Sequence, residues 1–449
     1  MNVAKFGGSS VANATQIRKI ADIIKSDENR KFIVVSAPGK RDKEDTKVTD
    51  LLINLEEAYR NEQDYEQPLS AIQERFREIV KELELDDSIL DEIFNKIESV
   101  LHDELSDEMK LDAIKAIGED SSAKLVSAFL NKQGILASYI NPKEAGIIVS
   151  DEPGNAQILP ESFEKIYELR KKDGVLLIPG FFGYTKTGEL ATFSRGGSDI
   201  TGAIIAAGVK AELYENFTDV DSVYTVNPTI VDQPKEITSL TFTEMRELSY
   251  AGFSVFHDEA LIPAFRENIP VCIKNTNNPS AKGTLIVPER ELAREDCVSG
   301  IASDTGFCSL YVSKFLMNRE IGFGRKLLQI LEDEGVSFEH APSGIDDMSV
   351  IIRERNLTDE KEKNIIYRIK NELHADTVTM LRDLAVIMVV GEGLENTIGV
   401  AQKATNAFAE ADVNILMINQ GSSEVSMMFG VKSEDMERSI QSLYKAFFD

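Results

Sequence analysis

Short, continuous apolar runs alternate with helical segments over roughly the first 290 residues of this chain. The clearest of these runs are FIVVSA at 32–37, GVLLIPGFFG at 174–183 and AELYENFTDV at 211–220. Between them, apolar residues recur at helical spacing, as from Ile17 to Ile24. Strands that are apolar throughout are covered on both faces, which is typical of parallel sheets in α/β proteins. The pattern therefore predicts a largely parallel α/β core that binds ligands at the carboxyl ends of its strands.

Residues 54–116 break this alternation, because they are acidic, poor in glycine and helical in spacing. Their apolar positions, such as Leu83, Leu90 and Ile97, define one face of a helical segment. We expect a helical insertion or lid over the sheet. A solvated helical hairpin with no role at a functional site is an equally good interpretation of the same pattern.

The last third of the chain contains an internal repeat. Segments 335–352 and 412–431 each read as strand, Gly/Ser turn and strand, and each lies between two helical segments. The run DTVTML completes the first copy as a β-α-β-β-α-β unit, whereas the second copy lacks a strand. Because the run CVSGIAS could supply that strand, we expect the first copy (305–381) to be inserted in the second (297–304 plus 384–449). Chance similarity of two ordinary β-turn-β segments is the alternative.

Charge and cysteine content exclude several classes of function. Lys and Arg number 49 against 76 Asp and Glu, a net charge of −27, which argues against a nucleic-acid partner and an anionic membrane surface. The three cysteines lack paired spacing and favour reduced thiols over disulfides or a metal site. No apolar run reaches the roughly 20 residues that span a bilayer, and the start lacks a signal-peptide core. We therefore expect a cytoplasmic protein.

Two glycine pairs each lie between a predicted strand and a predicted helix. KFGGSS at 5–10 follows the first strand, and FSRGGSDIT at 193–201 follows a later one. Adjacent glycines let backbone N–H groups approach an anion, which the N-terminus of a helix also attracts. The first pair differs from a P-loop because Lys5 precedes the glycines. Taken alone, it is equally well interpreted as a plain tight turn.

Charged side chains accompany these turns. Arg195 and Asp199 belong to the second turn, and Asp219 ends a third strand. Cations that neutralise phosphates, together with carboxylates that can position Mg²⁺, are what phosphoryl transfer requires. The combination favours a phosphoryl-transfer enzyme over unrelated structural turns.

Six motifs, in order along the chain, resemble those of the aspartate kinases. They are KFGGSS, AIGEDSSAKL, GFFG, FSRGGSDIT, TDVDSVYT and the C-terminal repeat, so the resemblance covers essentially the whole chain. It implies an amino-acid kinase domain over 1–290, a carbamate-kinase-like three-layer open α/β sheet sandwich, followed by two ferredoxin-like ACT regulatory domains. It also implies transfer of the γ-phosphoryl group of ATP, with Mg²⁺, to the side-chain carboxylate of L-aspartate. The product, 4-phospho-L-aspartate, leads towards lysine, threonine and methionine.

The resemblance also implies roles for individual residues. Lys5 matches the catalytic lysine that neutralises phosphate charge, and Asp199 matches the acid that holds it. The residues expected to bind ATP are Lys5, Gly7, Gly8, Ser9, Thr218, Asp219 and Tyr224. Those expected to bind aspartate are Ser36, Thr49, Glu119, Phe181, Arg195 and Ser198. Among these, Arg195 would clamp a carboxylate through its planar fork and Glu119 would pair with the α-ammonium. No protein metal ligand is expected.

The chain departs from the family pattern at three places. Thr229 and Ser254 stand where the family usually has an arginine and a lysine near the nucleotide, and Lys274 is a candidate replacement. An insertion at 38–48 separates Ser36 from Thr49 and weakens the assignment of Thr49.

Residues of the repeat match positions where ACT domains hold an inhibitory amino acid. They are Met317, Glu320, Gly322, Phe323, Gly324, Glu339, Ser343 and Gly344. An acid such as Glu339 would suit the ammonium of a lysine effector, so lysine is favoured over threonine. Open sheet edges in such domains favour a homodimer or a larger assembly. Alternatively, these residues only shape the turn and pair two chains.

Two other functions remain compatible with the sequence. One keeps the fold and changes the acceptor to glutamate, acetylglutamate or carbamate, although Glu119 and Arg195 argue for aspartate. The other is a non-catalytic amino-acid sensor, which the replacements at Thr229 and Ser254 would favour. The retained Lys5 and Asp199 argue against such a loss of activity.

Overall fold

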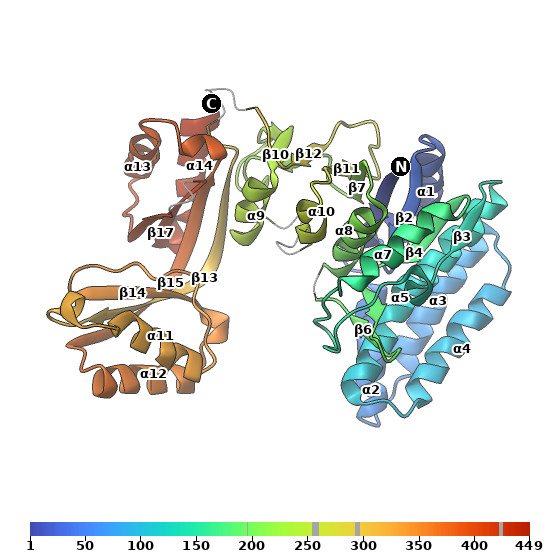
Figure 1. Cartoon of the computed structure of the whole chain (residues 1–449), viewed down its shortest axis with the longest axis horizontal. Coiled ribbons are helices and arrows are strands. Elements are labelled where there is room, and N and C mark those ends of the chain that lie inside the picture. The colour runs from blue at the N-terminus through green and yellow to red at the C-terminus, as the bar shows by residue number, and fades with distance from the viewer. Residues whose placement is uncertain (195, 254–259, 292–296, 422–424) are drawn as a thin grey trace. The chain divides into compact units, whose positions relative to one another are not determined.

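The structure is a computed structural model of the chain, and it describes every residue except 195, 254–259, 292–296 and 422–424 (Figure 1). The chain forms two compact units, and the second takes up two short segments from the middle of the sequence. The first unit comprises Met1–Val223, Glu236–Arg246 and Ser254–Arg290. The second unit comprises Tyr224–Lys235, Glu247–Phe253 and Glu291–Asp449.

An eight-stranded sheet forms the centre of the first unit, in the order β10-β12-β11-β7-β1-β2-β4-β3. Its strands are β1 (Asn2–Phe6), β2 (Arg30–Val35), β3 (Ala137–Tyr139), β4 (Val175–Pro179), β7 (Leu213–Thr218), β10 (Ser239–Thr241), β11 (Val271–Asn275) and β12 (Thr284–Val287). All neighbouring strands pair in parallel except β11 and β12. The predicted, largely parallel α/β core is confirmed.

Helices cover both faces of this sheet, which explains why its strands are apolar throughout. The helices on one face are α1 (Ala14–Lys25), α2 (Val48–Arg60), α3 (Glu66–Leu83), α4 (Ser88–His102) and α5 (Asp107–Lys132). On the other face, α8 (Gly197–Val209) contacts β1, β2 and β7 and is flanked by α7 (Glu161–Tyr167) and α10 (Ile262–Arg266). Alternate residues of a strand face opposite sides, so Ala4 and Phe6 of β1 pack with α1.

The acidic stretch 54–116 lies within α2, α3, α4 and α5, which form a packed layer on the first face (Figure 1). Buried residues such as Leu55, Phe76 and Ile97 join the same apolar core as α1. Its role as a lid stays a prediction. Shorter elements before residue 253 include α6 (Pro142–Ala145), β5 (Phe182–Tyr184), β6 (Leu190–Thr192), β8 (Val223–Tyr224), β9 (Glu236–Ile237) and α9 (Phe242–Tyr250).

A five-stranded antiparallel sheet organises the second unit, in the order β14-β13-β15-β17-β16. Its strands are β13 (Gly300–Ser313), β14 (Asp347–Arg353), β15 (Thr377–Val390), β16 (Met417–Gln420) and β17 (Ser426–Lys432). The two long strands, β13 and β15, pair with each other along their whole length, with a register shift between Asp304 and Ser309.

The long strands carry two apolar cores, one on each side of this shift. One core packs α11 (Phe323–Asp333) and α12 (Asp359–Glu372) against β14 and the adjoining parts of the long strands. The other packs α13 (Val400–Glu410) and α14 (Met436–Phe448) against β17 and the opposite ends of the long strands. Figure 1 shows α11 and α12 side by side beneath the sheet. None of the described helices combines the length and hydropathy that a membrane span requires.

Candidate active site

Lys5 and Asp199 form a buried ion pair in the middle of the first sheet. Lys5 is on β1, the strand between β7 and β2, and Asp199 is in the first turn of α8. Lys5 Nζ lies 2.6 Å from Asp199 Oδ1, and the two side chains are 8% and 17% exposed. Burying an ammonium group costs free energy unless it is paired with an opposite charge, so the ion pair with Asp199 holds the Lys5 ammonium in place.

Two residues that sequence reasoning missed hold Asp199 from β7. Asn216 Nδ2 donates to Asp199 Oδ1 at 2.6 Å, and the Tyr214 hydroxyl donates to the Asp199 carbonyl at 3.2 Å. Asn216 is the register partner of Lys5 on the neighbouring strand, so both side chains face the same side of the sheet. Tyr214, Glu215 and Asn216 follow one another in β7, so no local pattern shows which of them contacts Asp199.

The first glycine pair lies directly beside the Lys5 ammonium. The Gly7 N–H donates to the Phe217 carbonyl at 3.0 Å, and the chain then enters a 3₁₀ turn, Gly8–Val11. A Cβ at Gly7 would lie 3.4 Å from Lys5 Nζ, and one at Gly8 would lie 3.1 Å from the Ala37 carbonyl oxygen. The glycines therefore allow a close approach of the backbone to the lysine.

The second glycine pair begins α8, and Ser198 follows it. Gly196 has a φ of 80°, and a Cβ at Gly197 would meet the Phe181 ring at 2.5 Å. Phe181 has a left-handed φ of 79°, and its N–H donates to Thr201 Oγ1 at 2.9 Å. A Cβ at Gly180 would lie 2.6 Å from Ser198 Oγ. Phe181 and Ser198 thus lie together where β4 ends.

Ser36 and Thr49 lie at the two ends of the loop that follows β2. The Ser36 N–H donates to the Phe6 carbonyl at 3.1 Å, which places it beside the end of β1. The Val48 N–H donates to the Pro38 carbonyl at 3.0 Å and closes the loop just before Thr49. Thr49 therefore lies in the first turn of α2 near the end of β2, despite the inserted residues.

Glu119 is a buried carboxyl on α5 with an oxygen that lacks a partner. Its Oε2 has no hydrogen-bond partner among the described residues, and the residue is 5% exposed. Burial raises the pKa of Glu119 to about 8, against a hydrogen bond from the Ala37 amide. Unpartnered buried acceptors are uncommon in native proteins.

Thr218 ends β7, next to β1, and Asp219 follows it. Thr218 Oγ1 donates to Asp219 Oδ1 at 3.2 Å, and the Thr276 N–H donates to the Thr218 carbonyl at 2.9 Å. Lys274 on β11 lies 3.5 Å from Glu215 Oε1 and is thus engaged by a buried acid. Tyr224 is the last residue of β8 and belongs to the second unit. Arg195 and Ser254 lie outside the residues that the structure describes.

Most of the predicted effector residues lie in two adjoining turns of the second unit. Gly322, with a φ of 82°, caps α11, and the first residue of that helix, Phe323, is buried. Glu320 binds Lys314 and Lys326, and these hydrogen bonds lower its pKa to about 2. Met317 is buried in the same turn and Gly324 follows in α11.

Backbone contacts join this turn to the turn that contains Ser343 and Gly344. The Lys314 N–H donates to the Asp346 carbonyl at 2.8 Å, and Asn318 N–H donates to the Ile345 carbonyl at 3.1 Å. Glu339 lies before this turn, beside the paired residues His340 and Ile351. Its carboxylate accepts hydrogen bonds from Arg353 Nε at 3.2 Å and from the Tyr250 hydroxyl.

Comparisons with known proteins match this chain to one protein family along its whole length. The model of the amino acid kinase family matches residues 1–275, and an ACT domain model matches residues 387–447. Aspartokinase 3 of Bacillus subtilis is 56% identical over 449 residues, which cover 100% of this chain and 99% of that protein.

Solved structures are similar over the full length as well. The aspartate kinase of Clostridium acetobutylicum has a TM-score of 0.87 and 39% identity, covering 100% of both chains. Aspartokinase III of E. coli, with aspartate and ADP in its R-state, has a TM-score of 0.80 and 25% identity. The same enzyme with lysine and aspartate in its T-state has a TM-score of 0.75 and 25% identity, and both cover 100% of each chain.

Proposed function

This chain belongs to the aspartate kinases (EC 2.7.2.4) of the amino-acid kinase family, with allosteric regulation through ACT domains, and from that premise we propose how its own residues carry out the reaction. The observation that carries the proposal is the buried Lys5–Asp199–Asn216 cluster at the carboxyl ends of β1 and β7. Lys5 neutralises the charge that moves between the donor phosphate and the acceptor carboxylate. Asp199 and Asn216 fix its position.

The nucleotide is ATP, because a relative, E. coli aspartokinase III, was solved with ADP. Lys5, Gly7, Gly8 and Ser9 bind its phosphates, and Thr218, Asp219 and Tyr224 bind the remainder. Mg²⁺ accompanies ATP. The described residues contain no group of three or more His, Cys, Asp or Glu side chains able to hold a metal. The ion would therefore rely on phosphate oxygens and water, as Mg²⁺ commonly does.

The acceptor L-aspartate is held between opposite charges. Glu119 takes the α-ammonium, Arg195 clamps a carboxylate, and Ser36, Thr49, Phe181 and Ser198 complete the pocket. The attacking side-chain carboxylate is already ionised at neutral pH, so it needs no general base. Catalysis consists of placing this carboxylate in line with the γ-phosphoryl group and compensating charge in the transition state.

Feedback regulation acts through a lysine effector, a proposal supported by the lysine in the T-state of E. coli aspartokinase III. The binding site is the pair of adjoining turns with Met317, Glu320, Gly322, Phe323, Gly324, Ser343 and Gly344. Glu339 contributes only if the effector displaces Arg353 or Tyr250 from it. We propose two nested ACT domains, 305–381 within 297–304 plus 384–449. Chains would then pair through the edge strands β14 and β16 as a homodimer or larger assembly.

Replacement of Lys5 by methionine tests the catalytic assignment. Lys5→Met should lower kcat on the order of 100-fold or more, because the positive charge is lost and the side-chain length is kept. Initial rates with Mg-ATP and L-aspartate, with acyl phosphate trapped as hydroxamate, measure the effect. Lys31→Met on β2, whose ammonium binds the Arg170 carbonyl, is the matched control and should stay within about twofold. Near-normal turnover of Lys5→Met would reject the role.

A further inference from the structure

A buried arginine fastens the loop between β2 and α2, residues 38–47, to helix α3. Arg75 is 2% exposed, and its Nη1 donates to the Gly39 carbonyl at 2.9 Å. Its Nη2 donates to Asp45 Oδ2 and, at 3.2 Å, to the Thr46 carbonyl. A single guanidinium thus binds both limbs of the loop through its fixed fork of donors.

The same loop presses against the first glycine turn. The Gly39 N–H donates to the Gly8 carbonyl at 2.8 Å. A Cβ at Gly39 would lie 2.6 Å from the Gly8 carbonyl carbon and 2.9 Å from the Ser9 nitrogen. There is no room between loop and turn, so any shift of Gly39 moves Gly8 or breaks their hydrogen bond.

Both ends of the loop reach the proposed aspartate pocket. Ser36 lies just before it and Thr49 just after it, and the Val48–Pro38 hydrogen bond closes the loop at 3.0 Å. The loop therefore contacts the proposed phosphate turn through its middle and the proposed acceptor pocket through its ends.

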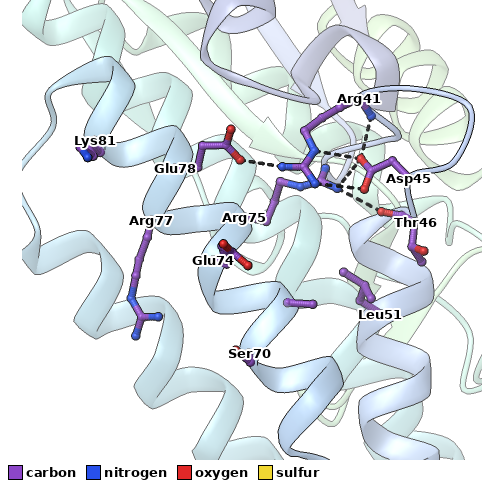
Figure 2. A pocket seen from close by; sticks show the side chains of 11 residues that line it. Arg41, Asp45, Thr46, Leu51, Ser70, Glu74, Arg75, Arg77, Glu78 and Lys81 are labelled. Carbon is purple, nitrogen blue, oxygen red and sulfur yellow. Dashed lines mark hydrogen bonds and ion pairs between the residues drawn. The ribbon is translucent and has the colours of Figure 1, made fainter.

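Arg41 and Glu78 bind the same loop from its more exposed side. Figure 2 shows Arg41 and Arg75 converging on Asp45, while Arg77 points away from the loop. Arg41 is 37% exposed, with Nη1 2.6 Å from Glu78, at an open cavity of about 880 Å³. Burial raises the pKa of Asp45, but hydrogen bonds from Arg41 and the charge of Arg75 outweigh it and hold that pKa below its usual range. Exposed ion pairs contribute little to stability, so we expect the buried Arg75 to contribute more than Arg41 to holding the loop.

We propose that Arg75 is a positioning residue of the kinase reaction, which holds loop 38–47 so that the Gly8 turn and Thr49 keep their places around the reacting groups. It touches neither substrate itself. This inference rests on the proposed roles of Gly8 and Thr49. It gives the helical layer over the sheet a function at the site, because α3 supplies the arginine.

Replacement of Arg75 by methionine tests the proposal. Arg75→Met should lower kcat/KM for both ATP and aspartate on the order of 10- to 100-fold, because small misplacements of reacting groups are costly. Arg75→Lys, which keeps the charge but loses the fork, should recover part of that loss. Arg77→Met is the matched control, since Arg77 donates to Gln73 and lies over the Phe94 ring on the same helix layer, and its constants should stay within about twofold.

Kinetics are compared well below the Tm of each variant, so that a loss of stability does not lower the folded fraction. Arg75→Met with constants like those of Arg77→Met would overturn the proposal. If Arg75→Met does not fold, Gly39→Ala replaces it, because this change keeps Arg75 and forces the loop off the turn. Normal kinetic constants for Gly39→Ala would likewise overturn it. Normal turnover of Lys5→Met would instead reject the proposed function, so the two failures are distinguishable.

Discussion

The carboxyl group of Glu119 occupies a place where ionisation is costly. It is buried on α5, one of its oxygens lacks a partner among the described residues, and its pKa is raised to about 8. At pH 7 the group is therefore mostly protonated in the free enzyme. A ligand ammonium beside it would favour the ionised form and lower the pKa again.

Aspartate binding at pH 7 should therefore release most of a proton per site, provided that Glu119 pairs with the α-ammonium. Titration calorimetry in two buffers of different ionisation enthalpy measures this release. Glu119→Gln, which keeps the shape, should release markedly fewer protons and bind aspartate more weakly. Equal proton release by the two proteins would contradict the pairing.

The same group sets a pH dependence of stability in the free enzyme. Its pKa is raised from 4.5 by folding, so the folded chain binds the proton more tightly than the unfolded chain. The free energy of unfolding should consequently fall as pH rises from about 4.5 to about 8, and Glu119→Gln should weaken this fall. Denaturant titrations across that range provide the control for the calorimetry.

Among single residues, the sequence motifs identified those that lie in the glycine turns. The other residues of the site were identified only from strand register and helix packing. Lys5 and Asp199 are recognisable because each accompanies a glycine pair. Asn216 and Arg75 are not, because their partners are distant in sequence and are reached through strand pairing or helix packing. A single sequence carries no sign of either contact.

Among the elements of the first sheet, β2 and β7 are joined across β1 by a buried ion pair. Arg30 Nε and Nη2 bind Glu215 Oε2 and Oε1 at 2.6 and 2.9 Å. Arg30 also donates from Nη1 to the Ile23 carbonyl at 2.6 Å, which links the end of α1 to the same point. The pair fixes three elements at the start of the central strand.

Arg30→Met should lower the free energy of unfolding by about 3–5 kcal/mol, because it leaves the buried Glu215 carboxylate without its main partner. The double variant Arg30→Met/Glu215→Leu should recover much of this loss. Chemical denaturation measures both. Lys172→Met removes an exposed pair with Glu144 and should cost about 1 kcal/mol or less. A similar cost for the two single variants would contradict this account.

Element type followed from the sequence where periodicity was strong. The apolar runs predicted β2, β4 and β7, and helical spacing predicted α1. The antiparallel placement of β12 was not predictable, because strand order depends on chain crossovers that leave no local pattern. Glu215 had no apparent partner either, since Arg30 lies 185 residues away.

At the scale of the whole molecule, the C-terminal region makes this kinase a regulated one. If the adjoining turns around Gly322 and Ser343 bind lysine, saturating L-lysine should lower the initial rate with aspartate. L-threonine at the same concentration should have a much smaller effect. Rate measurements with each amino acid test this directly. Equal inhibition by both, or by neither, would contradict the choice of effector.

The sequence predicted two repeats in this region, with 305–381 inserted between 297–304 and 384–449, but it did not show that single unbroken strands run through both cores. β13 and β15 each contain 14 residues and continue through a register shift into both apolar cores. A register shift interrupts the alternation of side chains between the two faces of a strand, and in the sequence this interruption looks like the end of the strand. Only the observed strand pairing shows that the strand continues through it.

These shared strands have a consequence for recombination and engineering. The part of this region around either apolar core cannot be exchanged alone between relatives. Each junction of such an exchange would cut β13 or β15 in the middle of a hydrogen-bonded sheet. We therefore expect new effector specificity to arise by single substitutions in the turns, while the two apolar cores evolve together.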